Sequence, residues 1–265
     1  MRRTLQAWLG VAAILAGGAP VRASTFDHSG FDSLLRAHVV DGMVDYDAFA
    51  RSAGFRSYLD SLAEADLSGL DGAERLALWI NAYNAYTIQL VVEHQERDSI
   101  RNINKTLFLK LKGPWKEELA RVAGEVYHLD AIEHDVIRKR FDEPRIHFAL
   151  VCAAMGCPPL RSEAYTGARL EEQLQDQSVR FLLETPARNR VDVANRVVYG
   201  SMIYVSYYRE DFGGSDEKIG EYLAGFYPDG PEKQLLLSGD FELRETEYDW
   251  TLNSQEKARE LARGR

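Results

Sequence analysis

Residues 74–92 constrain the fold more than any other segment, because apolar side chains lie on nearly every side of the helix they predict. One side of this helix carries large apolar residues: Leu76, Trp79, Ile80, Tyr83, Leu90 and Val91. The other sides carry four more apolar residues: Leu78, Ala82, Ala85 and Ile88. A helix that is apolar all round is stable when other elements bury it. We therefore expect a central helix around which the rest of the chain packs.

Helix and strand patterns alternate irregularly along the rest of the chain. Apolar residues at helical spacing predict further helices over residues 31–39, 129–140, 170–183 and 215–226. Runs of β-branched and aromatic residues predict a tight hairpin over 39–44, strands over 124–129 and 145–152, and a second hairpin over 190–205. This order favours an α+β fold, a single domain in which the buried helix packs against a small, mostly antiparallel sheet. Such an arrangement is loosely similar to that of papain and the transglutaminases.

Two asparagines lie within the predicted central helix. Asn81 and Asn84 are three residues apart, so their side chains lie on neighbouring turns of one face. A buried amide must find hydrogen-bond partners, because leaving it without them is costly. Two interpretations stay open: the amides bond the backbone of nearby loops, or they form a polar strip that points into a binding site.

Further polar candidates lie on two other predicted elements. Glu133 and His134 belong to the predicted helix over 129–140, and His147 and Cys152 belong to the predicted buried strand. The side chains of a regular strand alternate between its two faces. His147 and Cys152 therefore share a pocket only if the strand bulges or ends before Cys152.

Residues 1–23 have the order of a cleavable signal peptide. Arg2 and Arg3 precede an apolar run over residues 5–16, and small residues follow before a cleavage site after Ala23. The apolar run is much shorter than the roughly 20 residues that span a bilayer. We expect a periplasmic or extracellular protein that is secreted through this segment and has no membrane span after cleavage.

The remaining chain has no linker rich in proline, glycine or serine, which predicts one globular domain over residues 24–253 and a charged tail over 254–265. The net charge of the whole chain is −9. Lysine and arginine are interleaved with acidic residues, whereas binding to a phosphate backbone requires clustered basic residues. We expect no nucleic-acid partner.

Cys152 and Cys157 are the only two cysteines of the chain. In an oxidising compartment, two neighbouring cysteines favour a disulfide, whereas in the cytosol a thiol or metal site would be favoured. Export therefore favours a Cys152–Cys157 bridge. Its short loop adds about 2 kcal/mol in the chain-entropy model, so its main effect would be on the shape of the loop.

Five short motifs follow one another along the chain. They are VDGMVDY at 40–46, WINAYNA at 79–85, IEH at 132–134, HFALVC with GCPPL within 147–160, and YDWTLN at 248–253. Together they resemble the domain of unknown function 547 family, from about residue 31 to residue 253. That family occurs in exported bacterial proteins and in plants, and the resemblance implies no particular reaction. It does imply that the polar residues within the motifs converge on one site: Asn81, Asn84, Glu133, His134, His147 and Cys152.

Two functional hypotheses follow. The first is a binding or accessory module with a polar pocket for an unknown small molecule, peptide or envelope protein, lined by Asn81, Asn84, Glu133, His134 and His147. The alternative is a cysteine-dependent hydrolase or acyltransferase, with Cys152 as nucleophile and His147 as base. A metal site is disfavoured because the spacing of His128 and His134 is not a zinc spacing. We expect neither a metal nor a cofactor.

Overall fold

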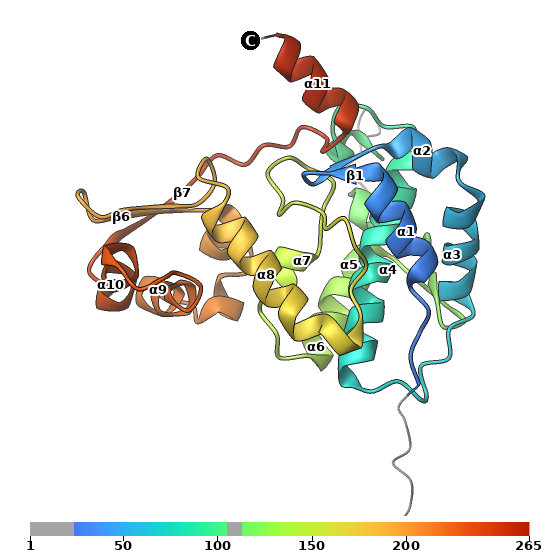
Figure 1. Cartoon of the computed structure of the whole chain (residues 1–265), viewed down its shortest axis with the longest axis horizontal. Helices are drawn as coiled ribbons and strands as arrows, with labels where there is room; N and C mark the ends of the chain where they lie inside the picture. Colours follow the sequence, from blue (N-terminus) through green and yellow to red (C-terminus); the bar gives the residue numbers. More distant parts are fainter. Residues whose placement is uncertain (1–23, 105–112, 265) are drawn as a thin grey trace, which may run out of the picture.

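The predicted central helix lies at the centre of the fold. The computed structural model describes residues 24–104 and 113–264, and helix α4 (Gly72–Glu93) runs through the middle of its N-terminal half (Figure 1). Asp71 caps this helix, because its carboxylate accepts a hydrogen bond from the Glu74 N–H. Sixteen of its 22 residues are buried, which confirms the burial inferred from the apolar pattern.

Three N-terminal helices cover α4 on one side. They are α1 (Ser29–His38), α2 (Tyr46–Arg51) and α3 (Ala53–Ala63), and Figure 1 shows them stacked beside α4. The side chains of Asp45 and Ser52 cap α2 and α3 in turn. The predicted hairpin joins α1 to α2 as strands β1 (Val39–Val40) and β2 (Met43–Val44).

The strands form three small sheets. The β1–β2 hairpin is one, and β3 (Ala120–Val122) with β4 (Glu125–Tyr127) is another antiparallel hairpin. In the third sheet, β5 (Arg190–Asp192) is antiparallel to β6 (Val197–Gly200), which is parallel to β7 (Glu242–Glu245). The chain is therefore α+β with mostly antiparallel strands, as predicted. These strands are divided among three sheets, and helices supply much of the packing around α4.

The prediction of a buried strand over residues 145–152 is wrong. Residues 146–149 form the short helix α7 (Ile146–Ala149), and the chain is extended only after it. The extended part bonds a side chain in place of a neighbouring strand: Asn84 donates to the Ala149 carbonyl at 3.0 Å and accepts from the Val151 N–H at 2.9 Å. A short apolar run fits a buried helix as well as a buried strand, so the pattern alone could not separate them.

The C-terminal half has a second apolar cluster. Its helices are α8 (Leu170–Leu183), α9 (Asp216–Ala224), which Ser215 caps, and α10 (Pro231–Ser238). Helices α8 and α9 confirm the helices predicted over 170–183 and 215–226. Phe148 of α7 and Phe181 of α8 belong to this cluster. Helix α7 therefore joins the two halves of the core.

Short helical turns complete the element order. The region of the predicted helix over 129–140 is built as α5 (Leu129–Ala131), the π-helix η3 (Ile132–Ile137) and α6 (Arg138–Arg140). A second π-helix, η5 (Ile203–Tyr207), precedes the 3₁₀ turn η6 (Arg209–Phe212). Three further 3₁₀ turns are η1 (Ile100–Asn102), η2 (Pro114–Lys116) and η4 (Gly167–Arg169).

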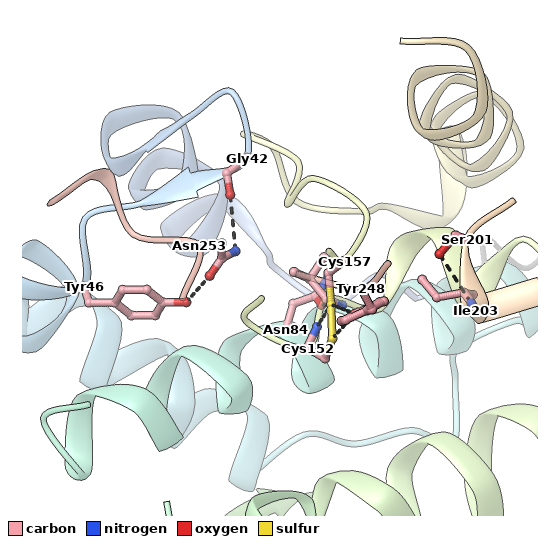
Figure 2. The surroundings of a disulfide bond; sticks show 10 residues. Gly42, Tyr46, Asn84, Cys152, Cys157, Ser201, Ile203, Tyr248 and Asn253 are labelled. Atoms are coloured by element: carbon pink, nitrogen blue, oxygen red, sulfur yellow. Dashed lines mark hydrogen bonds between the residues drawn. A yellow bond between two sulfur atoms is a disulfide. The ribbon is translucent and has the colours of Figure 1, made fainter. Parts of the chain in front are cut away.

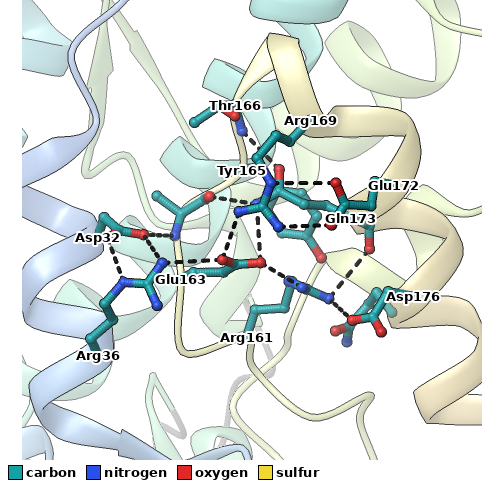
Figure 3. A network of polar contacts seen from close by, with 12 residues as sticks. Asp32, Arg36, Arg161, Glu163, Tyr165, Thr166, Arg169, Glu172, Gln173 and Asp176 are labelled. Atoms are coloured by element: carbon teal, nitrogen blue, oxygen red, sulfur yellow. Dashed lines mark hydrogen bonds and ion pairs between the residues drawn. The ribbon is translucent and has the colours of Figure 1, made fainter.

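An ion-pair network ties α1 to the loop that leads into α8. Glu163 pairs with Arg36, Arg161 and Arg169, and Asp32 of α1 accepts the Ala164 N–H (Figure 3). The Glu163 carboxylate is mostly screened from water, with 13% of its side chain exposed. Burial raises the pKa of Glu163, but hydrogen bonds from Arg161, Arg169 and Gln173 outweigh it and lower the pKa to about 2.

The segment predicted as a charged tail, residues 254–265, contains an exposed helix. Helix α11 (Gln255–Arg263) begins after Ser254, whose hydroxyl accepts the Lys257 N–H, and it has no buried residue. No helix in the part of the chain that the structure describes is long and apolar enough to cross a bilayer. The predicted signal peptide over residues 1–23 lies outside the described residues.

We expect Asn84→Leu to destabilise the fold by about 2–4 kcal/mol, because it leaves the Val151 N–H and the Ala149 carbonyl without partners in the core. Urea unfolding measures the difference. The matched control is Gln89→Leu on the same helix, since Gln89 bonds only the exposed Glu93. Equal stability of the two variants would contradict the anchoring role of Asn84.

Candidate functional site

A pocket of about 360 Å³ lies between the central helix, η3, α7, η5 and the C-terminal segment. Its polar lining includes Asp130, Glu133, His134 and His147. Six aromatic side chains form much of the rest: Tyr83, Trp115, Tyr207, Tyr208, Tyr248 and Trp250. Its size suits a small molecule or one large side chain.

His147 is the most enclosed polar side chain of the pocket. Its ring is fully buried, and Nε2 donates to Asp211 Oδ2 at 2.7 Å. Arg138 holds the same carboxylate with two hydrogen bonds, of 2.7 and 2.6 Å. The hydrogen bond from His147, together with Arg138 and against the effect of burial, holds the pKa of Asp211 well below its usual range. Asp211 therefore stays ionised and fixes the orientation of His147.

Glu133 faces the other nitrogen of His147. Its Oε1 atom lies 3.6 Å from His147 Nδ1, which is buried and has no hydrogen-bond partner. Burial raises the pKa of Glu133, but the attraction of His147 and Tyr208 outweighs it, so the pKa lies below its ordinary value. Burial and the Glu133 carboxylate raise the pKa of Tyr208, whose hydroxyl therefore stays protonated.

The π-helix η3 places Glu133 and its neighbours at the pocket. His134 lies one residue further along, and Arg138 donates from Nη1 to His134 Nδ1 at 2.9 Å. The same Arg138 reaches Asp211 on η6. Wider turns of this kind often occur at functional sites. Here the turn links a pocket carboxylate to the arginine that supports the opposite side of His147.

The two cysteines form part of the pocket wall. Their sulfur atoms lie at bonding distance in a disulfide, and the Tyr248 hydroxyl lies 2.9 Å from Cys152 Sγ and 3.0 Å from Cys157 Sγ (Figure 2). The Val151 N–H next to Cys152 is held by Asn84. The bridge is consistent with the predicted pairing, and it leaves neither sulfur as a thiol.

Aromatic rings support the histidine and form the rim. The Tyr208 ring stacks on His147 with centroids 3.9 Å apart and an interplanar angle of 18°. Trp250 contacts Tyr248 and Trp115, with centroid distances of 4.6 and 6.0 Å. These rings give the pocket flat, apolar walls around its carboxylates.

Comparison with known families matches residues 67–182 to the model described as "Protein of unknown function, DUF547". The chain is therefore similar to the DUF547 family over this segment. This segment contains the motifs around Asn81, Glu133 and His147, whereas the motifs at 40–46 and 248–253 lie outside it. Neither the curated proteins nor the solved structures contain a match.

The DUF547 segment supplies most of the pocket residues expected from sequence. Glu133, His134, His147, Cys152 and Cys157 all line the pocket. The two asparagines do not belong to the lining. Asn81 bonds the backbone N–H and carbonyl of Tyr165 at 2.9 and 2.7 Å, and Asn84 holds Ala149 and Val151. Both amides therefore fix loop backbone.

Sequence reasoning missed Asp211 and the aromatic lining. Asp211 lies 64 residues after His147 and belongs to none of the five motifs. Tyr248 and Trp250 belong to the last motif, at 248–253, and this position could have indicated the pocket. No group of three or more histidine, cysteine or acidic residues in the described ranges is arranged to hold a metal ion.

The pH dependence of stability in the Asp211→Asn variant tests whether the Asp211 carboxylate is ionised in the fold. The pKa of Asp211 is lower in the folded state than in the unfolded state, where it is about 3.9. The ionised carboxylate therefore stabilises the fold at pH values above about 3.9, and this contribution is lost as the pH falls. We expect the wild type to exceed Asp211→Asn in unfolding free energy at pH 7, with the difference shrinking below about pH 4. Urea unfolding measures this difference down to the lowest pH at which both proteins fold.

The control is Asp135→Asn, because Asp135 pairs with Lys139 on the exposed surface. We expect this control to stay within about 0.5 kcal/mol of the wild type at pH 7. A difference between wild type and Asp211→Asn that does not change with pH would show that Asp211 contributes shape rather than charge.

Proposed function

We propose that this chain is an exported ligand-binding domain whose pocket takes the positively charged group of a small molecule or of a peptide side chain. The DUF547 match assigns no activity, and the support for a ligand comes from the pocket itself. Its volume and its flat aromatic walls support a ligand with a compact apolar body.

The charge of the pocket supports a cationic ligand group. Two carboxylates, Asp130 and Glu133, line it, and no lysine or arginine of the described residues does. The lowered pKa keeps Glu133 ionised at neutral pH. The net charge of −9 favours the approach of cations over long distances.

The aromatic walls support the same choice of ligand. Tyrosine and tryptophan faces attract cations. Two of the lining rings show this attraction, because an arginine of the chain lies over one face of each. Arg101 lies 4.9 Å from the Trp250 centroid and Arg138 lies 5.3 Å from the Tyr208 centroid. The observation that carries the proposal is the combination of six aromatic rings with two carboxylates in one pocket without a lysine or arginine.

The cysteine-dependent hydrolase or acyltransferase using Cys152 and His147 receives less support. A cysteine nucleophile must be a thiolate, and both sulfurs are held in the bridge. The imidazole of His147 is also engaged by Asp211 and covered by Tyr208. These contacts suit a rigid pocket wall.

Binding of benzylamine tests the proposal, with benzyl alcohol as the neutral analogue of similar shape. We expect benzylamine to bind more tightly, and Glu133→Gln to weaken its binding about tenfold, since the charge-assisted hydrogen bond is lost. Asp130→Asn, at a more exposed position, serves as a second variant. Isothermal titration calorimetry measures Kd.

The matched control is Glu125→Gln, because Glu125 lies on the exposed β4 strand and accepts only from Tyr127. Its Kd for benzylamine should equal that of the wild type. Equal affinity for benzylamine and benzyl alcohol, or unchanged binding in both pocket variants, would refute a cation site.

Export is tested by intact mass spectrometry of the protein collected from the periplasm or the medium. We expect a chain that begins at Ser24 and gains two hydrogen atoms on reduction of Cys152–Cys157. The Cys152→Ser variant should show no such intramolecular gain. A chain that retains residues 1–23 would contradict cleavage, and two free thiols before reduction would contradict the bridge.

A further inference from the structure

Arg180 and Arg188 differ from the other partly buried arginines of the described residues. The others each pair with a carboxylate: Arg138 with Asp211, Arg145 with Glu143, Arg161 with Glu163 and Arg209 with Asp216. Arg180 and Arg188 are also partly buried, but within the described ranges neither guanidinium forms an ion pair or a hydrogen bond. A partly buried guanidinium without a carboxylate partner has N–H donors available to a partner from outside the chain.

Both arginines line the same small pocket, of about 200 Å³. It lies where the end of α8 meets the β1–β2 turn and the loop that follows Cys152. Cys157 lines this pocket as well as the aromatic pocket, so the disulfide loop lies between the two. The arginine pocket is therefore a separate candidate site.

The walls of the arginine pocket are held in place without a ligand. Gly42 has a φ of +81°, and a side chain there would approach Pro159 Cβ to 2.6 Å, so the turn presses directly on the loop. Gln177 of α8 donates to the Pro159 carbonyl at 2.8 Å. Asn253 donates to the Gly42 carbonyl at 3.3 Å, as Figure 2 shows. A preformed wall lowers the ordering cost of binding.

We propose that Arg180 and Arg188 form a binding site for an oxyanion, the carboxylate or phosphate group of a small ligand. The planar guanidinium offers paired N–H donors that match the oxygens of either group. Burial lowers the pKa of Arg188, and the nearby Asp249 carboxylate offsets this only in part. A bound anion would remove that cost.

Two acidic residues also line the pocket and oppose anion binding. Asp41 and Glu184 are exposed, and neither pairs with the arginines. Solvent screens exposed charges, so they weaken an anion's binding without preventing it. Neutralising one of these two carboxylates should therefore strengthen anion binding, so the site has a variant with higher affinity than the wild type.

Calorimetric titration of the full chain with inorganic phosphate, and separately with sodium acetate, at low ionic strength tests the site. We expect one of these probes to bind, and Arg180→Gln and Arg188→Gln each to weaken it at least about tenfold. Glu184→Gln should tighten it. Binding of phosphate alone assigns a phosphate ester, and binding of acetate alone assigns a carboxylate.

The matched control is Arg75→Gln, because Arg75 is exposed, lies outside the pocket and forms no ion pair within the described residues. Its Kd should be that of the wild type. An equal loss in this control would indicate non-specific attraction and overturn the proposal. So would the absence of binding by both probes.

A wild-type measurement covers the case in which the arginine variants fail to fold. Phenylglyoxal modifies accessible guanidinium groups, and peptide mass spectrometry locates the modified residues. We expect phosphate or acetate to protect Arg180 and Arg188 while Arg75 reacts as before. Equal modification with and without the anions would overturn the site. Benzylamine should not protect these arginines, so failure here is distinguishable from failure of the cation pocket.

Discussion

The two hydrogen bonds of Asn84 connect the core of this fold to its pocket. Helix α4 is stable because it is buried, and a buried amide must bond on both its oxygen and nitrogen. Asn84 does so through the backbone of Ala149 and Val151. That contact places His147 on one side of the anchored residues and Cys152 on the other. The position of the pocket wall is therefore set from within the central helix.

The same contact explains why local sequence patterns predict some elements of this fold correctly and others not. Burial of α4 and the amphipathic pattern of α8 follow from apolar spacing, and both are found. The segment around His147 is apolar throughout, and nothing within it distinguishes a strand from a buried helix. Its conformation depends on a side chain more than 60 residues earlier, which no periodicity within the segment encodes.

The candidate site has the same mixture of local and long-range determinants. Glu133 and His147 could be selected from their motifs, whereas Asp211 meets His147 only after the chain has folded across 64 residues. An acidic residue at a turn before a helix is usually explained by capping. Asp211 is distinguished by its contacts to His147 and Arg138, which form only in the folded structure.

The disulfide loop lies between the aromatic pocket and the arginine pocket. The Cys157 residue lines both, and the loop is held by backbone hydrogen bonds from Met155 to Thr251 and from Gly156 to Asp249, each of 2.7 Å. A side chain at Gly156 would approach the Asp249 nitrogen to 2.8 Å, so the C-terminal segment packs directly against this loop. Backbone hydrogen bonds hold the outer side of this loop, and Asn84 holds the residue before Cys152. The wall between the pockets is therefore tightly packed on both sides. A cation and an anion would then be bound next to each other, each by its own set of contacts, because only Cys157 lines both pockets.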